Sequence, residues 1–241
     1  MKKKQLRSAL SEGLSSWLTF EHHVGRDELF SERYLALPIA QILRNHVSGK
    51  VVAEHNHPVL AVPGRQGRPP QLDFVVQDSG KTTLVLESKW AEERGVSVAD
   101  VVWDCIRLEL AAHYYGCEAI FVLAGTRAQV DSVLESASFN PKTTRGKPSP
   151  VLGLNGKGRL SLNVQSPKRD FGPAVHKILQ GYSKVAWPRS FVCSHGTQLP
   201  KDPGVNQYTA AVWHIKPEES SKRYTFLSDA QPKPLARKPR K

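Results

Sequence analysis

The chain has 241 residues, a formal net charge of +12 and three cysteines. A chain of this length can form one large domain, or a domain with appendages, whose core is stable without covalent staples. Cys105, Cys117 and Cys193 are odd in number and lack metal-site spacing, which argues against a disulfide framework. No apolar stretch approaches the roughly 20 residues that span a bilayer. We therefore expect a soluble, cytoplasmic protein with no membrane partner.

The N-terminal residues are predicted to be helical. Residues 5–20 place leucines and aromatic residues at roughly helical spacing, and we assign residues 1–26 to a helical extension. Asp27 is a favourable N-cap residue and predicts a second helix that runs to about Asn45. Pro38 is expected to kink this helix or to divide it.

The second helix carries carboxylates on its apolar side. Leu35, Ile39 and Leu43 form an apolar stripe, and Glu28 and Glu32 fall on the same stripe by helical spacing. A carboxylate that faces the core needs a partner, because burying it alone is expensive. Glu32 therefore either lies at the edge of the stripe and meets an arginine, or faces a functional site.

The next segment predicts a strand, an exposed connection and a strand hairpin. The strand covers residues 50–62, the Gly-, Arg- and Pro-rich connection covers residues 63–70, and the hairpin strands cover residues 73–77 and 83–89 around a turn at residues 78–81. Three charged groups interrupt the apolar pattern of the hairpin: Asp73, Glu87 and Lys89. Glu87 and Lys89 are two residues apart and so share one face of their strand.

The length of the hairpin loop decides whether Asp73 joins that face. A two-residue loop at Ser79-Gly80 would pair Asp73 with Leu86 and put the two carboxylates on opposite faces. A loop of three or five residues would set Asp73 directly opposite Glu87. We expect the odd-numbered loop, with a divalent cation between the facing carboxylates to offset their repulsion.

A strong helix is predicted to follow, from Ser97 or Val98 to about Tyr115. Two charged residues, Asp104 and Arg107, lie beside its apolar face. Arg107 is suited to hold a phosphate or to orient a carboxylate, and an ion pair with Asp104 three residues earlier is at least as well supported.

The remaining elements complete a mixed sheet with helices on both faces, an α/β (α+β) fold. We predict a buried strand over residues 118–125, a helix capped by Thr126 to about 139, a strand pair over 151–164 turning at Asn155-Gly156, a helix over 171–181, and late antiparallel strands over 191–195 and 208–215. Residues 141–217 would thus extend the same domain through a basic loop, a helix and strands, and residues 218–241 would form a disordered basic tail.

The positive charge is unevenly distributed. Residues 11–140 hold 11 basic and 17 acidic residues, whereas residues 141–170 hold seven basic and one acidic. This pattern fits an acidic centre flanked by surfaces for a polyanion such as nucleic acid, although basic tails can also serve solubility alone. The expected nucleic-acid-binding residues are Arg65, Arg68, Lys142, Arg145 and Lys147.

These features resemble the PD-(D/E)xK phosphodiesterase superfamily, which has the restriction-endonuclease-like fold. The resemblance rests on an αβββαβ order over roughly residues 27–137, within a predicted core of residues 27–140, and on Asp73, thirteen intervening residues and then Glu87-Ser88-Lys89. Leu72 rather than proline precedes Asp73, and the helix after the hairpin shows no second catalytic motif.

The resemblance implies a metal-dependent nuclease, foremost a DNA endonuclease. Asp73, Glu87 and the Ser88 carbonyl, with Glu32 directly or through water, would hold Mg²⁺, or Mn²⁺ in its place. Lys89 would orient or deprotonate the attacking water and offset charge in the transition state. Asp73, Glu87, Lys89 and Glu32 are accordingly the expected catalytic residues.

Two other classes of function stay open at this point. The fold could serve as a catalytically silent nucleic-acid-binding module, or the chain could be a basic RNA-associated protein that binds through residues 141–170 and its tails. DNA is favoured over RNA as the partner. A homodimer would suit cleavage of both strands of a duplex.

Overall fold

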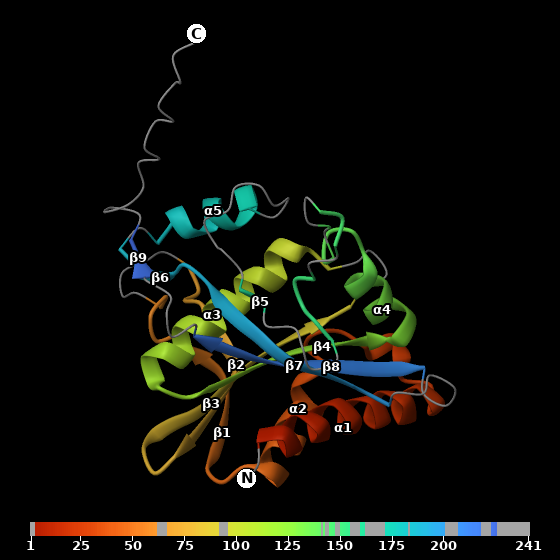
Figure 1. The fold of residues 1–241 in the computed structure, drawn as a ribbon. Helices are drawn as coiled ribbons and strands as arrows, with labels where there is room; N and C mark the ends of the chain where they lie inside the picture. The colour runs from red at the N-terminus through yellow and green to blue at the C-terminus, as the bar shows by residue number, and fades with distance from the viewer. Residues whose placement is uncertain are drawn as a thin grey trace, which may run out of the picture.

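The computed structural model of the chain describes residues 3–61, 67–91, 96–140, 142, 145–147, 150–154, 160–161, 172–182, 184–200, 207–217 and 223–225. The centre of the molecule is a seven-stranded mixed sheet with the order β1-β2-β3-β4-β8-β7-β5 (Figure 1). Its strands are β1 (Lys50–Asn56), β2 (Gln71–Asp78), β3 (Lys81–Trp90), β4 (Glu118–Thr126), β5 (Leu160–Ser161), β7 (Phe191–Leu199) and β8 (Tyr208–Pro217). A second sheet pairs β6 (Trp187–Pro188) with β9 (Arg223–Tyr224).

Helices cover both faces of the large sheet, as the sequence predicted. They are α1 (Lys3–His23), the 3₁₀ helix η1 (Asp27–Leu29), α2 (Ala36–His46), α3 (Val98–Tyr115), α4 (Arg127–Glu135) and α5 (Gly172–Gln180). In Figure 1, α1 and α2 lie below the sheet, and α3 and α5 lie above it. Among the described residues, no helix combines the length and the apolar character needed to cross a membrane.

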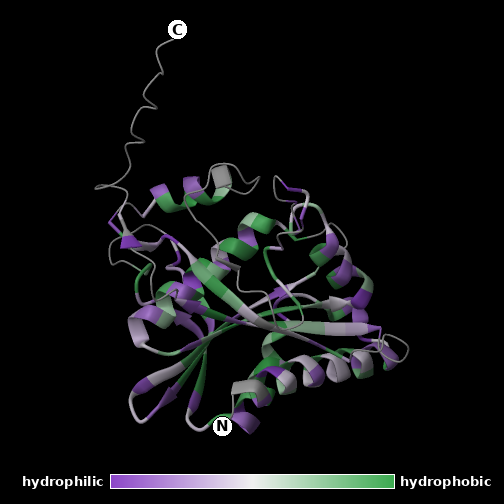
Figure 2. Ribbon diagram, in the orientation of Figure 1, coloured by the Kyte–Doolittle hydropathy of each residue, from purple (hydrophilic) through white to green (hydrophobic). Residues whose placement is uncertain are grey.

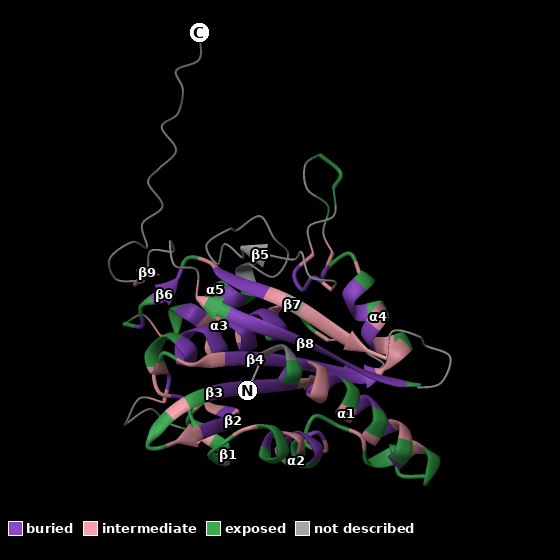
Figure 3. Ribbon diagram, turned by 60° about the horizontal axis from the view of Figure 1, so that its bottom comes forward, coloured by how far each residue is buried: buried purple, intermediate pink, exposed green. Residues whose placement is uncertain are grey.

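The two helical layers enclose two apolar cores, one on each face of the sheet. Figure 2 shows hydrophobic residues gathered along the strands in the middle of the molecule, and Figure 3 shows those strands buried. β4 is buried along nearly its whole length, as the continuous apolar run at residues 118–125 predicted. A strand covered on both faces reads as an unbroken apolar run, because neither face meets water.

Helix α1 is held against the sheet by leucines and by a serine. Leu6, Leu10, Leu14 and Leu18 recur every four residues and are buried on one face. On the same side, the Ser11 hydroxyl donates to the Ala210 carbonyl of β8 at 2.6 Å. The N-terminal helix is therefore packed against the strand that follows much later in the chain.

The predicted continuous helix from Asp27 to about Asn45 is wrong. Asp27 begins η1, and α2 begins only at Ala36, with Leu35 as its N-cap residue and Pro38 in its first turn. Proline lacks an amide hydrogen and its ring clashes with the carbonyl four residues earlier, so it is accommodated best near a helix start.

The predicted odd-numbered loop of the β2–β3 hairpin is also wrong. Asp78 pairs with Lys81 across a two-residue turn, Ser79-Gly80, and both turn residues have positive φ, 48° and 77°. Positive φ at both central residues matches the twist of the flanking strands. The ladder then shifts by one residue, and Thr83 is left as the extra residue of a β-bulge.

This bulge restores the register that we predicted for the carboxylates. Beyond it, Val76 pairs with Leu84 and Phe74 pairs with Leu86, so the next step of the ladder sets Asp73 opposite Glu87. The bulge therefore has the effect on the register that we expected of a loop of three or five residues.

Helix α3 connects β3 to β4 as predicted. Ser97 is its N-cap residue and accepts a hydrogen bond from the Asp100 amide, and Gly116 ends the helix in the left-handed conformation at φ 64°. Because β3 and β4 are parallel, the helix must cross one face of the sheet between them. That crossing brings α3 over the face that carries Glu87.

The C-terminal part agrees only partly with expectation. β7 and β8 are antiparallel neighbours, as predicted. β5 pairs with β7 rather than with residues 151–154, and the expected turn at Asn155-Gly156 lies outside the described residues. The expected disordered tail is corrected at Arg223–Tyr224, which form β9.

β9 is joined to the core by a buried ion pair. Arg223 Nη2 lies 2.5 Å from Glu109 Oε1 on α3, and Glu109 is almost fully buried. Burial raises the pKa of the Glu109 carboxyl to about 7, although Arg223 opposes the shift. The folded protein thus holds a proton on Glu109 at a pH at which the unfolded chain has already lost it.

Glu109 should make the folded state less stable as the pH rises. Between pH 4.5 and about 7 the unfolded chain binds fewer protons at this site than the folded chain, so the free energy of unfolding falls with pH. Relative to Glu109→Gln, we expect the wild-type protein to lose about 3 kcal/mol over this range. Urea unfolding of both proteins at several pH values measures the difference, and a constant difference would contradict the assigned pKa.

Candidate active site

The residues that break the apolar pattern of the hairpin meet at the end of β3, beneath α3. They contact two further charged residues from that helix and one from the turn before α2. We call the following six residues the charged cluster: Glu32, Asp73, Glu87, Lys89, Asp104 and Arg107.

Asp73 lies where β2 and β3 separate. Its Oδ2 atom accepts hydrogen bonds from the Ser88 amide at 2.7 Å and from the Ser88 hydroxyl at 2.8 Å. The amide and carbonyl of a strand residue point toward the same neighbouring strand. The Ser88 carbonyl therefore faces the side on which Asp73 lies, as a shared metal site would need.

Glu87 is the most deeply buried acid of the charged cluster, with 3% of its surface exposed. Its Oε1 atom lies 2.8 Å from Arg107 Nη2, as an ion pair without hydrogen-bond alignment. Burial raises the pKa of the Glu87 carboxyl well above its usual range; Arg107 opposes this effect, while Asp73 and Asp104 add to it. Glu87 thus has a buried oxygen whose capacity to accept is unfilled by any described hydrogen bond.

Lys89 bridges two carboxylates from different elements. Its Nζ atom lies 3.2 Å from Glu32 Oε2 and 3.2 Å from Asp104 Oδ2. Burial acts to lower the pKa of the ammonium, but the two carboxylates outweigh it and raise that pKa above the ordinary lysine value. Lys89 is therefore a fixed positive charge in this arrangement.

Glu32 reaches the charged cluster from a turn rather than from the predicted helix. It precedes α2, and 48% of its side chain is exposed. Its partner is Lys89 and not an arginine. Burial raises the pKa of Glu32, and the contact with Lys89 lowers it. Glu28 is exposed at the surface.

Arg107 contacts a carboxylate on β3 and also forms the expected ion pair with Asp104. Its Nη1 atom lies 3.2 Å from Asp104 Oδ1, and its Nη2 atom holds Glu87 and also donates to the Gln71 carbonyl. The Arg107 carbonyl is in hydrogen-bond contact with His57 Nε2 at 2.9 Å. Arg107 therefore orients a carboxylate and ties α3 to the start of β2.

Asp104 was not among the site residues expected from the sequence. It is 4% exposed, and burial raises the pKa of its carboxyl, opposed by Lys89 and Arg107. The available signal was an acid and a base three residues apart on the core-facing side of a helix that crosses the sheet.

Glu54 was also missed, and it lies opposite Asp73 on β1. The neighbouring pairs Ala53–Phe74 and His55–Leu72 place it there. Its φ is 52°, a conformation that costs a residue other than glycine about 1–2 kcal/mol. The Glu54 carboxylate pairs with Arg68 at 2.9 Å, which offsets a further negative charge beside Asp73.

The expected nucleic-acid-binding residues fall into separate groups. Arg68 is exposed and lies beside Asp73 in a shared pocket, whereas Arg65 lies outside the described residues. Lys142, Arg145 and Lys147 are exposed in the segment after α4. They take no part in the contacts that build the charged cluster.

The charged cluster holds more acidic than basic groups. Four carboxylates face two cations, which leaves a net charge of −2 when all six groups are ionised. Asp73, Glu87 and the Ser88 carbonyl supply hard oxygen ligands, and Glu87 has the unfilled buried oxygen. Within the described residues, no three His, Cys, Asp or Glu side chains are grouped so that they could hold a metal ion. Mg²⁺ is commonly held by one or two carboxylates together with water and substrate phosphates, so this donor set fits it.

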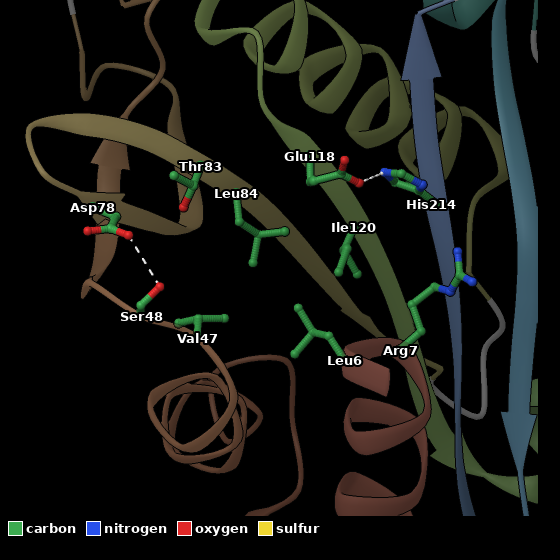
Figure 4. A pocket seen from close by; sticks show the side chains of 10 residues that line it. All are labelled: Leu6, Arg7, Val47, Ser48, Asp78, Thr83, Leu84, Glu118, Ile120 and His214. Atoms are coloured by element: carbon green, nitrogen blue, oxygen red, sulfur yellow. Dashed lines mark hydrogen bonds and ion pairs between the residues drawn. The ribbon is translucent and has the colours of Figure 1, made fainter. Parts of the chain in front are cut away.

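A second pocket lies at the opposite end of β3 (Figure 4). It has a volume of about 240 Å³ and a largely apolar lining that includes Leu6, Leu84 and Ile120. Its polar residues are Arg7, Ser48, Asp78, Thr83 and the contacting pair Glu118 and His214. Glu118 contacts His214, and Asp78 accepts hydrogen bonds from the hydroxyls of Ser48 and Ser79. The two acids lie in one pocket with Arg7 and His214, so this pocket lacks the excess of acids found in the charged cluster.

Comparisons with known proteins supply no relative for this chain. No protein family, curated protein or solved structure matches it. The geometry of the charged cluster therefore carries the functional inference.

Removing the Arg107 guanidinium should destabilise the fold strongly. In Arg107→Met, Glu87 and Asp104 remain buried and lose their common partner, which should cost about 3–5 kcal/mol of the free energy of unfolding. Adding Glu87→Gln removes one of the uncompensated charges and should recover part of that loss. Urea unfolding of both variants and of Glu87→Gln alone tests this coupling; a loss below about 1 kcal/mol in Arg107→Met would show that Arg107 does not hold the acids.

Proposed function

We propose that this protein is a metal-dependent nuclease that hydrolyses phosphodiester bonds, with DNA as its preferred substrate. One observation carries the proposal: the hairpin register, continued by one residue beyond the pair Phe74–Leu86, sets Asp73 opposite Glu87, and Lys89 forms an ion pair with Glu32 beside them. The facing carboxylates have no structural benefit of their own, because like charges opposite each other destabilise a sheet. A site for a cation and a phosphate explains why they are held together.

The order of the elements supports the finer reading as a PD-(D/E)xK enzyme with a restriction-endonuclease-like core. A helical N-terminal region is followed by β1, β2, β3, α3 and β4, which is the αβββαβ order of that fold. On this reading Asp73 is the aspartate of the motif, Glu87 is its second acid and Lys89 is its lysine.

Asp73 and Glu87, with the Ser88 carbonyl and with Glu32 directly or through water, would hold Mg²⁺ or Mn²⁺. When bound, such an ion lowers the pKa of a coordinated water and neutralises charge on the scissile phosphate. Arg107 keeps the Glu87 carboxylate in place through their 2.8 Å contact. Asp104 shares Lys89 with Glu32 and so positions its ammonium.

Lys89 would act as a fixed charge rather than as a base. A general base must give up its proton near the working pH, whereas the pKa of Lys89 is raised above the ordinary lysine value by Asp104 and Glu32 despite its burial. The role that suits a protonated lysine is to orient the attacking water and to stabilise negative charge on the phosphate in the transition state.

The pairing within the charged cluster favours one other candidate function. Glu87 is already paired with Arg107, and Lys89 with two acids, which is also how a nucleic-acid-binding module without catalysis would neutralise such residues. That module would bind through basic segments such as the one that holds Lys142 and Arg145.

For cleavage of both strands of a duplex by the proposed nuclease, we favour a homodimer.

Lys89→Ala should abolish cleavage while the protein remains folded. Supercoiled plasmid, single-stranded DNA and structured RNA are each incubated with Mg²⁺, Mn²⁺ or EDTA. Losing the charge that stabilises the transition state should lower the rate by about 100-fold or more. Lys81→Ala is the matched control, because Lys81 is an exposed lysine at the other end of the same strand.

Each outcome of this experiment has a clear meaning. Metal-dependent cleavage that disappears in Lys89→Ala and persists in Lys81→Ala supports the nuclease. Full activity of Lys89→Ala overturns the assignment of the site. Salt-sensitive binding without cleavage by any of the three proteins favours the binding module.

A further inference from the structure

A pocket with an aromatic wall opens directly beside Asp73. It has a volume of about 350 Å³, within the range of small-molecule sites. Six of its lining residues matter here: Arg68, Gln71, Asp73, Trp103, Arg107 and Tyr182. The proposed nuclease chemistry uses Asp73 and Arg107 but gives no role to the two aromatic residues.

The aromatic wall is rigid and partly exposed. The rings of Trp103 and Tyr182 lie 6.0 Å apart at an angle of 29°, and both side chains are half-buried. Behind them Trp187 is fully buried, with its ring 6.0 Å from Trp103 and 6.1 Å from Tyr182. Trp103 and Tyr182 stack on each other, and the buried Trp187 packs against both. The partly exposed pair therefore offers an apolar stacking surface whose side chains lose little conformational entropy on binding.

Arg68 supplies positive charge at the rim of the same pocket, whereas Arg107 is already paired with Glu87 and Asp104. Trp103 and Arg107 are four residues apart on α3 and are therefore neighbours on its surface. Arg68 is at the rim, where it pairs with Glu54 at 2.9 Å and most of both side chains is exposed. An exposed ion pair of this kind is worth less than about 1 kcal/mol, so Arg68 can exchange Glu54 for a phosphate at small cost.

We propose that this pocket binds one unpaired nucleobase of the substrate strand, stacked on Trp103 and Tyr182 next to the bond to be cleaved. Bases in a duplex are covered on both faces by their neighbours and cannot offer a face to this wall without leaving the stack. The substrate class that follows is single-stranded or locally unpaired nucleic acid. This inference rests on the proposed function, because it takes the charged cluster as the place of cleavage.

Binding of short labelled oligonucleotides tests the proposal. Fluorescence anisotropy in EDTA, at one fixed salt concentration, gives the Kd of the full chain for a single strand and for the duplex of the same sequence. Base–aromatic stacking is worth about 1–3 kcal/mol per base, so Trp103→Ala should raise the Kd for the single strand roughly 10- to 100-fold. Its Kd for the duplex should change little, and Trp103→Phe should keep most of the single-strand affinity.

A second test variant and a matched control complete the experiment. Tyr182→Leu should weaken single-strand binding in the same direction, which keeps the test valid if Trp103→Ala does not fold. Tyr114→Ala is the matched control, because Tyr114 is an exposed aromatic residue on the same helix, outside this pocket. Equal Kd values for the wild-type protein and the Trp103 and Tyr182 variants, or equal losses on single strand and duplex, would overturn the proposal.

The pocket and the nuclease activity can fail separately. If cleavage depends on Lys89 but Trp103→Ala leaves the single-strand affinity unchanged, the proposed base-binding pocket is refuted and the proposed nuclease function is retained. If single-strand affinity follows the aromatic wall but no metal supports cleavage, the proposed nuclease function is wrong and the pocket stands as a binding site.

Discussion

The ion pair between Arg107 and Glu87 is the interaction on which the rest of the site depends. It joins a helix to the central strand that the helix covers, and through the Gln71 carbonyl it also holds the start of β2. A guanidinium can do this because its planar fork of donors remains charged when buried. The Glu87 carboxylate needs this partner, because a buried carboxylate without one would take up a proton and lose its charge.

The charged cluster is assembled at a cost that the two apolar cores must offset. Burial raises the pKa of Glu32, Glu87 and Asp104, and their mutual repulsion adds to this effect. Such perturbed groups concentrate at functional sites, where ionisation is matched to a task rather than to stability. The left-handed backbone of Glu54 next to the same residues is a second local cost of this kind.

The sequence predicted the parts of the fold that are specified locally. Ser97 and Thr126 begin helices by accepting hydrogen bonds with their own side chains. The buried position of β4 follows from its continuous apolar run. The failures involve long-range contacts. Nothing near Arg223 signals that it will pair with Glu109, 114 residues earlier in the chain. The contact between Glu32 and Lys89 likewise joins residues that are distant in the sequence.

The candidate site shows the same division. The sequence could predict Asp73, Glu87 and Lys89 as candidate site residues because they interrupt apolar strands. Asp104 joins the candidate site only because α3 crosses the sheet above it. The hairpin register that leads toward Asp73 matches the one expected from an odd-numbered loop, although the loop itself has two residues. Turn length and bulge have the same effect on pairing, and the sequence does not distinguish them.

Because of the bulge at Thr83, the hairpin cannot lose one residue alone without moving its acids to opposite faces, but it can lose one residue if the turn gains one. Without the extra residue, the two-residue turn would pair Asp73 with Leu86 and turn Glu87 away from it. A chain that loses this residue can keep its acids together only by lengthening the turn by one. In relatives of this protein, loss of the bulge residue after residue 81 should therefore be accompanied by an added residue in the turn before it. The face on which the two acids lie would then be kept even where the hairpin sequence differs.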